Sequence, residues 1–334
     1  MAKQPYFNAE AGPYRLVTQS DFDGLVSAAL LRSRGIVDEV KFVHPRDVRD
    51  GLIELGAGDV SAGLPYVASV AMAFDHRLSE TLRSGTPRNH FVQASAPSTS
   101  RAIWDFFGGE QAFPDFPQDL LAVADRVGGG TFTREDVLSP NGWILLSFVI
   151  DPRTGLGRWA NFRVSNQQLL LDLMDYCLEL SVEEILQLPD IVERVTVYRE
   201  HEDAFRDQIE RCSLLWHNVL LVDLTGEDEI FGGNRFVKFA LFPQASVSVQ
   251  ITWGFERRHF VITVAKSIFN RSCSVNIGAL MAQQGGGGNA DAGTCQLPKD
   301  EAPRAVDQIV ERLSEVPVTD SGDRFRYKGF KGEL

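Results

Sequence analysis

The first half of the chain alternates between short apolar runs and longer stretches whose apolar residues recur with helical spacing. Tyr14–Thr18 and Glu39–Val43 predict buried strands, and Tyr66–Phe74, nearly all small or apolar, predicts a strand covered on both faces. Helical spacing is found in five further stretches: Leu25–Arg34, Ser98–Phe107, Gln118–Arg126, Thr133–Ile150 and Asn166–Leu180. Because strands alternate with helices, the pattern predicts an α/β fold with a parallel sheet wrapped by helices.

A long, charged amphipathic helix is predicted from Pro189 to about Cys212, and the pattern changes after it. Three strands are expected beyond it, at Leu214–Leu224, Ser246–Thr252 and His259–Ala265. Three helices are expected at Asn234–Leu241, Val275–Gln283 and Ala302–Leu313. A chain of 334 residues exceeds the ~250–300 residues at which a single core stops growing. The sequence therefore predicts two domains, residues 1–200 and 201–334, the second a smaller α/β domain with a mixed sheet.

The charge balance limits the partners. The formal net charge is −12, whereas a surface that binds duplex nucleic acid is normally basic. Extended contact with a nucleic-acid backbone is therefore disfavoured, and a small anionic ligand and plain solubility both remain open.

Cysteine spacing and hydropathy indicate the compartment. The four cysteines show no C-x-x-C pair, which disfavours a zinc ribbon or redox motif: Cys177, Cys212, Cys273 and Cys295. No apolar run approaches the ~20 residues that cross a bilayer, and the N-terminal residues lack a signal-peptide pattern. A cytoplasmic protein with reduced thiols and no membrane segment is expected, and assembly as a homodimer is left open.

Acidic side chains follow two of the predicted strands. Asp21 and Asp23 come directly after the first strand, with Gly24 beside them to permit a tight turn. Asp75 and His76 end the third predicted strand. At the carboxyl edge of a parallel sheet such side chains can turn toward one cation, and Mn²⁺ accepts both carboxylate and imidazole donors. The alternatives are a helix-capping aspartate and a surface Asp-His hydrogen bond.

Two weaker signals lie further along the chain. Asp125 closes an apolar helix before a run of glycines, and as an alternative it is a helix-end aspartate without a ligand. Gly285–Asn289 is a glycine-rich loop whose backbone N–H groups could approach a phosphate, the alternative being a flexible linker. Lys266, Asn270 and Arg271 lie just upstream and could add positive charge and hydrogen bonds.

These segments, in this order from about Tyr14 to about Leu313, resemble the DHH phosphoesterases, and most closely their exopolyphosphatase-like members. The resemblance implies a metal-binding domain, commonly with two Mn²⁺ ions, joined by a long helix to a substrate-binding domain. It implies that the catalytic residues are Asp23, Asp75 and His76. It implies that the metal ligands are Asp21, Asp23, His76 and Asp125. The residues expected to bind substrate are Arg77, Lys266, Asn270, Arg271, Gly286, Gly287, Gly288 and Asn289.

The chain departs from the family pattern at four positions. Gln19, Arg77 and Asn289 stand where the family has histidines, and Gly63–Tyr66 lacks the aspartate that bridges both ions. Asp59 is the nearest carboxylate to that position. One well-bound ion is therefore expected rather than two, with Mn²⁺ or Mg²⁺ as the metal. Arg77 could neutralise charge where an ion is missing or grip a phosphate with two donors.

Two functions follow from this comparison. The first is a metal-dependent phosphoesterase that hydrolyses a small phosphorylated substrate, such as polyphosphate, a short oligonucleotide or a cyclic dinucleotide. The second is a catalytically impaired relative that binds a nucleotide or a protein partner without turnover. A zinc peptidase and a serine hydrolase are disfavoured because neither the H-E-x-x-H nor the G-x-S-x-G pattern is present.

Overall fold

The computed structural model describes residues 7–77, 80, 83–85, 87–314 and 325–327, and it divides into two compact units. The units are Met1–Tyr198 and Arg199–Leu334. Helix α10 (Pro189–Arg211) belongs to both. The domain boundary predicted from the sequence lies at residue 200. Among the described residues, no helix is long and apolar enough to cross a membrane.

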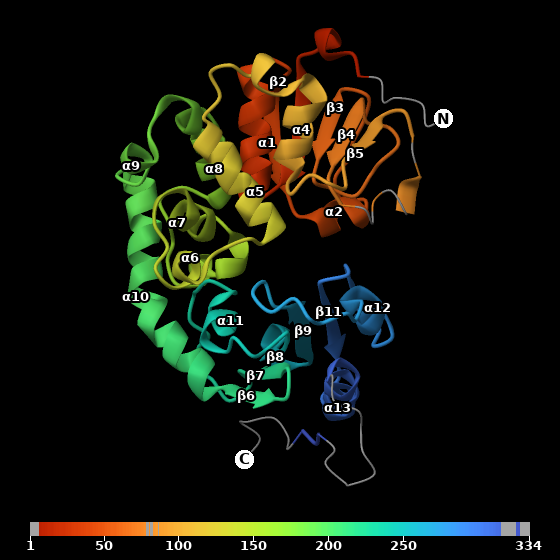
Figure 1. The fold of residues 1–334 in the computed structure, drawn as a ribbon, viewed down its shortest axis with the longest axis vertical. Coiled ribbons are helices and arrows are strands. Elements are labelled where there is room, and N and C mark those ends of the chain that lie inside the picture. Colours follow the sequence, from red (N-terminus) through yellow and green to blue (C-terminus); the bar gives the residue numbers. More distant parts are fainter. Residues whose placement is uncertain (1–6, 78–79, 81–82, 86, 315–324, 328–334) are drawn as a thin grey trace. The chain divides into compact units, whose positions relative to one another are not determined.

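The first unit is built on a five-stranded parallel sheet with strand order β2-β1-β3-β4-β5 (Figure 1). Its strands are β1 (Tyr14–Gln19), β2 (Val37–Val43), β3 (Asp59–Ala62), β4 (Met72–Asp75) and β5 (His90–Val92). Because all strands are parallel, their carboxyl ends meet at one edge of the sheet. The parallel sheet confirms the α/β prediction for this part of the chain.

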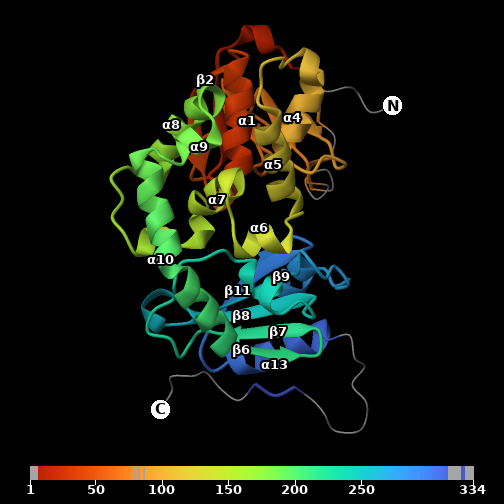
Figure 2. The ribbon, with the colours of Figure 1, turned by 60° about the vertical axis from the view of Figure 1, so that its left-hand side comes forward.

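Helices cover this sheet, and the apolar helix α1 (Phe22–Ser33) lies among three of them (Figure 2). The remaining helices are α2 (Pro45–Arg49), α4 (Thr99–Phe107), α5 (Gln118–Gly129), α6 (Arg134–Leu138), α7 (Gly142–Val149), α8 (Asn166–Glu179) and α9 (Val182–Ile185). Helix α1 packs against α4, α5 and α8, so its residues from Gly24 to Leu31 are all buried. This explains why its sequence is apolar on every side rather than along one stripe.

Three sequence-based element predictions were wrong in detail. Tyr66–Phe74 is not one strand: only Met72–Asp75 pairs, and β3 was missed because four residues are too few to show a pattern. The helix predicted over Thr133–Ile150 is two helices, α6 and α7, separated at Pro140, whose nitrogen has no hydrogen to donate. Leu214–Leu224 forms a hairpin of two strands, with His217 at positive φ in the turn.

The second unit contains a six-stranded mixed sheet with strand order β10-β11-β9-β8-β7-β6. Its elements are β6 (Ser213–Trp216), β7 (Val219–Asp223), α11 (Val237–Leu241), β8 (Val247–Trp253), β9 (Phe260–Lys266), α12 (Ile277–Ala282), β10 (Gly287–Gly288), β11 (Ala292–Leu297) and α13 (Ala302–Leu313). Strands β7 and β8 are parallel, and the other neighbours are antiparallel. The mixed sheet confirms the prediction for this part.

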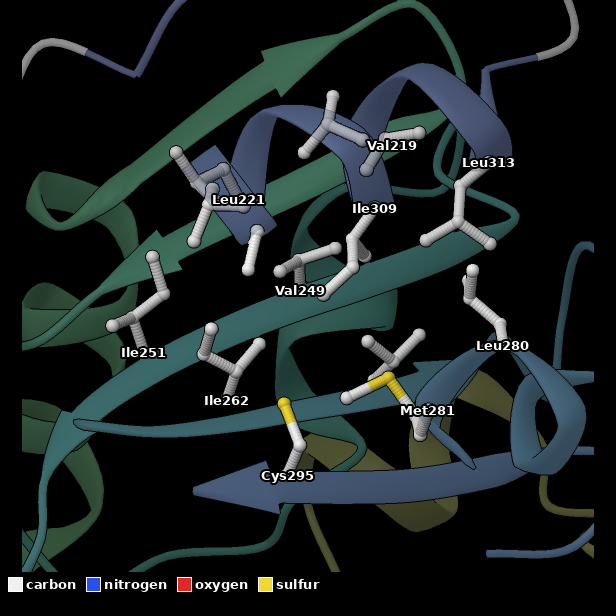
Figure 3. Packing of buried hydrophobic residues seen from close by; sticks show 14 of the residues in the cluster. Val219, Leu221, Val249, Ile251, Ile262, Leu280, Met281, Cys295, Ile309 and Leu313 are labelled. Carbon is white, nitrogen blue, oxygen red and sulfur yellow. The ribbon is translucent and has the colours of Figure 1, made fainter. Parts of the chain in front are cut away.

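Both faces of this second sheet carry an apolar core. On one face, alternate residues of β8 such as Val249 and Ile251 belong to one apolar cluster with Ile309 and other side chains of α13 (Figure 3). On the other face, Val222 and Phe239 belong to a smaller cluster with the end of α10. Alternate strand residues point to opposite faces, which is why the first four residues of β7, from Val219 to Val222, are all apolar.

A buried lysine in this unit gives a test of stability against pH. Lys238 is 6% exposed and its Nζ donates to Oε1 of Gln250 at 3.1 Å. Burial, with a smaller contribution from the charge of Arg235, lowers the pKa of Lys238 from 10.5 to about 8. The folded chain therefore binds fewer protons than the unfolded chain between these two values, and stability should rise with pH across that window.

Lys238→Met is expected to raise the free energy of unfolding at pH 7 by on the order of 2 kcal/mol, because the variant no longer buries a charge. The same substitution should remove the rise in stability between pH 8 and pH 10.5, the two pKa values involved. Urea unfolding at pH 7 and at pH 9.5 measures both effects. A variant that keeps the pH dependence of the wild-type chain would contradict this assignment.

Candidate active site

The acidic segment after β1 lies at the carboxyl edge of the parallel sheet. Asp21 is the N-cap of α1, and its Oδ1 accepts a hydrogen bond from the backbone N–H of Gly24 at 3.0 Å. The turn requires glycine, because a Cβ at Gly24 would lie 2.0 Å from the carbonyl oxygen of Gln19. The side chain of Gln19 also donates to Asp21. Burial raises the pKa of Asp21, and this effect exceeds the lowering by the charge of Arg153.

Asp23 holds the first turn of helix α4 from the neighbouring helix. Its two carboxylate oxygens accept from the backbone N–H groups of Thr99 and Ser100, each at 2.9 Å. The hydroxyl of Ser100 donates to the same carboxylate at 2.7 Å. A carboxylate at a helix N-terminus is favoured by the helix dipole. Asp23 therefore joins α1 to α4 and places negative charge at this end of α4.

Two more of the predicted residues contact the same turn. Nδ1 of His76 lies 2.9 Å from the hydroxyl oxygen of Thr99, and Oδ1 of Asp125 accepts from the hydroxyl of Ser98 at 2.7 Å. Asp23, His76 and Asp125 thus surround three consecutive residues, 98–100, at the start of α4. The structure brings the three side chains together around this turn, although they lie 102 residues apart in the sequence, from 23 to 125.

Arginines engage the carboxylates of this region. Arg77 donates from Nε and Nη2 to the two oxygens of Asp75, at 3.0 and 2.5 Å. Burial lowers the pKa of Arg77, but the hydrogen bond and the charge of Asp75 raise it by more, and the net shift is upward. Arg101 donates from Nε and Nη2 to Oδ2 of Asp125, at 2.9 and 2.5 Å.

A third arginine lies beside Asp21. Arg153, in the short 3-10 helix Pro152–Thr154, donates from Nε to Asp151 at 2.8 Å, and its Nη2 is 3.8 Å from Asp21. Arg101, Arg153 and the hydroxyl groups of the α4 turn were not predicted from the sequence. One sequence signal could have found Arg153: Asp151-Pro152-Arg153 repeats the Asp-x-Arg spacing of Asp75-His76-Arg77, and both arginines donate backbone and side-chain N–H groups to their aspartate.

The predicted metal ligands do not form a metal-binding group in this arrangement. Within the part of the chain that the structure describes, no three His, Cys, Asp or Glu side chains come together in a way that could hold an ion. Asp23 accepts from α4, Asp125 accepts from a hydroxyl and a guanidinium group, and His76 is bonded to Thr99. A divalent ion needs several such donors directed at one point. This donor set does not fit a resident ion, and no chemical step below is assigned to one.

The glycine-rich loop of the second unit is part of a structured hairpin rather than a linker. Its residues Gly287 and Gly288 form β10, which pairs with β11, and Oδ1 of Asn289 accepts from the backbone N–H groups of Asp291 and Ala292 at the turn. The loop also contacts α12, where Gly278 donates its N–H to the carbonyl oxygen of Asn289 at 2.6 Å. Close backbone packing therefore accounts for several of these glycines.

The other substrate-binding candidates of this unit lie just before α12. Nζ of Lys266 is 3.3 Å from the exposed carboxylate of Asp291. Asn270 donates from its side chain to the carbonyl oxygen of Gln244, and Arg271 donates from Nε to that of Ile268. Lys266 contacts Asp291, and Asp291 is bonded to Asn289 of the glycine loop. A role in substrate binding for Lys266, Asn270, Arg271 and the glycine loop stays a prediction.

The chain was compared with protein families, curated proteins and solved structures. No protein-family model matches the chain, and no curated protein matches it significantly. Among solved structures, it is 44% identical to a pGpG-specific phosphodiesterase, PggH, from Vibrio cholerae, with a TM-score of 0.78, covering 90% of this chain and 98% of that one. The DHH domain of a member of the s1p family of ribosomal proteins shares the fold, with a TM-score of 0.54 and 12% identity, over 92% of this chain and 88% of that one.

The chain belongs to the DHH superfamily of phosphoesterases. This confirms the family expected from the sequence motifs. The structure also bears on one departure from the family pattern, the missing bridging aspartate. Gly63 follows β3 at the edge where the bridging aspartate is expected, and a Cβ there would lie 3.3 Å from Oγ1 of Thr99. Asp59 begins β3 at the opposite edge and pairs with Arg15, so it is not a substitute for that aspartate.

The glycine loop of this DHH protein gives a matched pair of variants. A Cβ at Gly288 would lie 2.1 Å from the carbonyl oxygen of Ala292, whereas a Cβ at Gly287 meets nothing within 4 Å. Gly288→Ala should therefore destabilise the hairpin by about 1–3 kcal/mol, and Gly287→Ala should leave stability unchanged. Thermal unfolding of the two variants measures the difference. Equal unfolding midpoints for the two variants would show that close backbone packing is not the reason for a glycine at position 288.

Proposed function

We propose that this chain is a phosphodiesterase that hydrolyses a short linear dinucleotide of the pGpG kind. The observation that carries the proposal is the 44% identity to the pGpG-specific phosphodiesterase over 98% of that protein's length. The similarity covers 90% of this chain, so it extends over both units rather than one of them.

The chemistry of the site supports a small anionic substrate. Three arginines lie next to carboxylates at one region of the first unit, and guanidinium groups match the geometry of phosphate oxygens. The net charge of −12 disfavours long nucleic acids, which bind through many backbone contacts. A ligand with few phosphates, held by local arginines, agrees with both observations.

Several finer predictions from the sequence stand beside this proposal. An exopolyphosphatase-like specificity, taken from the family resemblance, is the alternative to the pGpG substrate. Dependence on a divalent ion such as Mn²⁺, also taken from the resemblance, and a cytoplasmic location stay predictions. Asp23, Asp75 and His76 are proposed as the catalytic residues. The contacts of Asp23 and His76 with the α4 turn support the assignment for these two residues, and the assignment of Asp75 rests on the family resemblance.

A substrate panel tests the proposal. Purified protein is incubated with pGpG, a cyclic dinucleotide, a longer oligonucleotide and polyphosphate, with Mn²⁺, with Mg²⁺ and with chelator, and released nucleotide or phosphate is quantified. The expected result is preferential hydrolysis of pGpG. Faster release from polyphosphate than from pGpG would replace the proposed substrate with the exopolyphosphatase-like one.

A second candidate function is binding of a nucleotide without turnover. It is favoured by the arginines on Asp75 and Asp125, which engage carboxylates that the family resemblance assigns to catalysis and metal binding. Folded protein that binds pGpG but releases nothing from any compound in the panel would support this second function against the first.

A further inference from the structure

Arg77 and Arg101 share one arrangement near the α4 turn. Each donates from the Nε and Nη2 side of its guanidinium group to one aspartate, Asp75 or Asp125. Among the described residues, none accepts a hydrogen bond from Nη1 of either arginine. The side chains are 31% and 26% exposed, so the outer edge of each guanidinium group is open to a ligand.

The carboxylates fix the direction of these open edges. The side chain of Asp75 is 1% exposed and that of Asp125 is 19% exposed, and each is held by further hydrogen bonds from the backbone of Arg77 or the hydroxyl of Ser98. A guanidinium group carries five N–H donors in a rigid plane, and two of its edges can each grip a pair of oxygens. With one edge on a carboxylate, the arginine is pre-oriented and loses little freedom when a phosphate binds the other.

Both arginines lie beside the same carboxylate. Arg101 is in the first turn of α4, to which Asp23 is bonded. Arg77 directly follows His76, whose Nδ1 lies 2.9 Å from Oγ1 of Thr99, and the backbone N–H of Thr99 donates to Asp23. Both arginines therefore belong to the region of the α4 turn that Asp23 holds, where the family resemblance expects metal ions but the described donors do not fit one.

We propose that Arg77 and Arg101 together form a phosphate-binding site next to Asp23, and that their guanidinium groups supply the positive charge that a resident ion would otherwise supply there. The inference rests on the proposed function in one respect, which is that the substrate carries phosphate. It adds Arg101 as a substrate-binding residue and assigns the role of Asp75 and Asp125 as holding arginines in place.

The test measures binding with metal removed. Isothermal titration of inorganic pyrophosphate and of pGpG is carried out in chelator on the wild-type chain and on Arg77→Lys, Arg101→Lys and the double variant. Lysine keeps the charge but cannot donate to a carboxylate and a phosphate through a fixed plane. Each single variant is expected to weaken binding by about tenfold, and the double variant by more.

Arg15→Lys is the matched control. Arg15 also donates from Nε and Nη2 to a buried aspartate, Asp59, and its side chain is likewise 31% exposed, but it lies at the opposite edge of the sheet. Its substitution should leave pyrophosphate binding unchanged. Thermal unfolding of all variants separates a loss of binding from a loss of fold. The change in the unfolding midpoint of Arg15→Lys is the reference for the site variants.

The outcomes separate this inference from the proposed function. Wild-type binding in chelator that falls in the two site variants supports the inference, even when pGpG is not hydrolysed. Binding that requires Mn²⁺, or that is unchanged in both folded variants, overturns it, even when pGpG is hydrolysed. Equal weakening in Arg15→Lys would also overturn it, because the effect would then not belong to this site.

Discussion

Asp23→Ala is expected to reduce turnover by at least about 100-fold, since small displacements of reacting groups cost that much. The carboxylate binds the backbone and side chain at the start of α4, and the same turn contacts His76 and Asp125. Without it, the turn that His76 and Asp125 contact loses its support. The loss of three hydrogen bonds at the start of α4 should also lower the free energy of unfolding by roughly 1–2 kcal/mol.

The effect on turnover can be separated from the effect on stability. Ser165 caps α8 in the same unit, where its hydroxyl accepts from the backbone N–H of Gln168 at 3.1 Å. Ser165→Ala should lower stability by a comparable amount and leave turnover intact. Steady-state rates and urea unfolding of both variants give the comparison. If the Asp23→Ala protein is folded and as active as the wild type, Asp23 is not part of the active site.

Asp75→Ala is expected to have the second largest effect, because it leaves Arg77 without its carboxylate. The side chain of Asp75 is 1% exposed, and it accepts from both the backbone and the guanidinium group of Arg77. Breaking a buried pair costs ~3–5 kcal/mol, and the partial exposure of Arg77 places the expected loss of unfolding free energy near ~2–3 kcal/mol.

A second substitution tests this explanation. In Asp75→Ala with Arg77→Met no unpaired charge remains, so the double variant should be more stable than Asp75→Ala alone. Both should lose turnover, since neither presents an oriented guanidinium group. The comparison also needs Arg77→Met alone. Denaturant unfolding of the wild-type chain, the two single variants and the double variant measures the four free energies of unfolding. A double variant whose loss equals the sum of the single losses would show that the two residues act independently.

Much of the first unit could be predicted because its signals are local. Asp21, Asp23 and Asp75 follow or end apolar strands, and parallel strands bring such ends to one edge. Asp125 gave only a weak signal of its own, at the end of a predicted apolar helix, and the family resemblance made it a metal ligand. Strand β3 was missed because it has four residues. The glycine run was left open as a phosphate-binding loop or a flexible linker, because its close packing against β11 is not visible in the sequence.

The contacts of the site could not be predicted as a whole. Arg101 and Asp125 pair across the packing of α4 against α5, and Thr99 meets His76 from a helix 23 positions further along. These contacts depend on how the helices pack, which hydrophobic spacing alone does not specify. Arg153 is different, because it repeats the Asp-x-Arg spacing of Arg77 and was within reach of sequence comparison inside the chain itself.

The measurement that tests the central claim most directly is the fate of pGpG on incubation with the purified chain, followed by chromatography. Hydrolysis of the phosphodiester of this linear dinucleotide gives two molecules of guanosine monophosphate. The account predicts that pGpG disappears as the mononucleotide accumulates in a ratio of one to two, and that Asp23→Ala abolishes both changes. Intact pGpG after incubation with folded wild-type protein, with Mn²⁺ and Mg²⁺ both supplied, would contradict it.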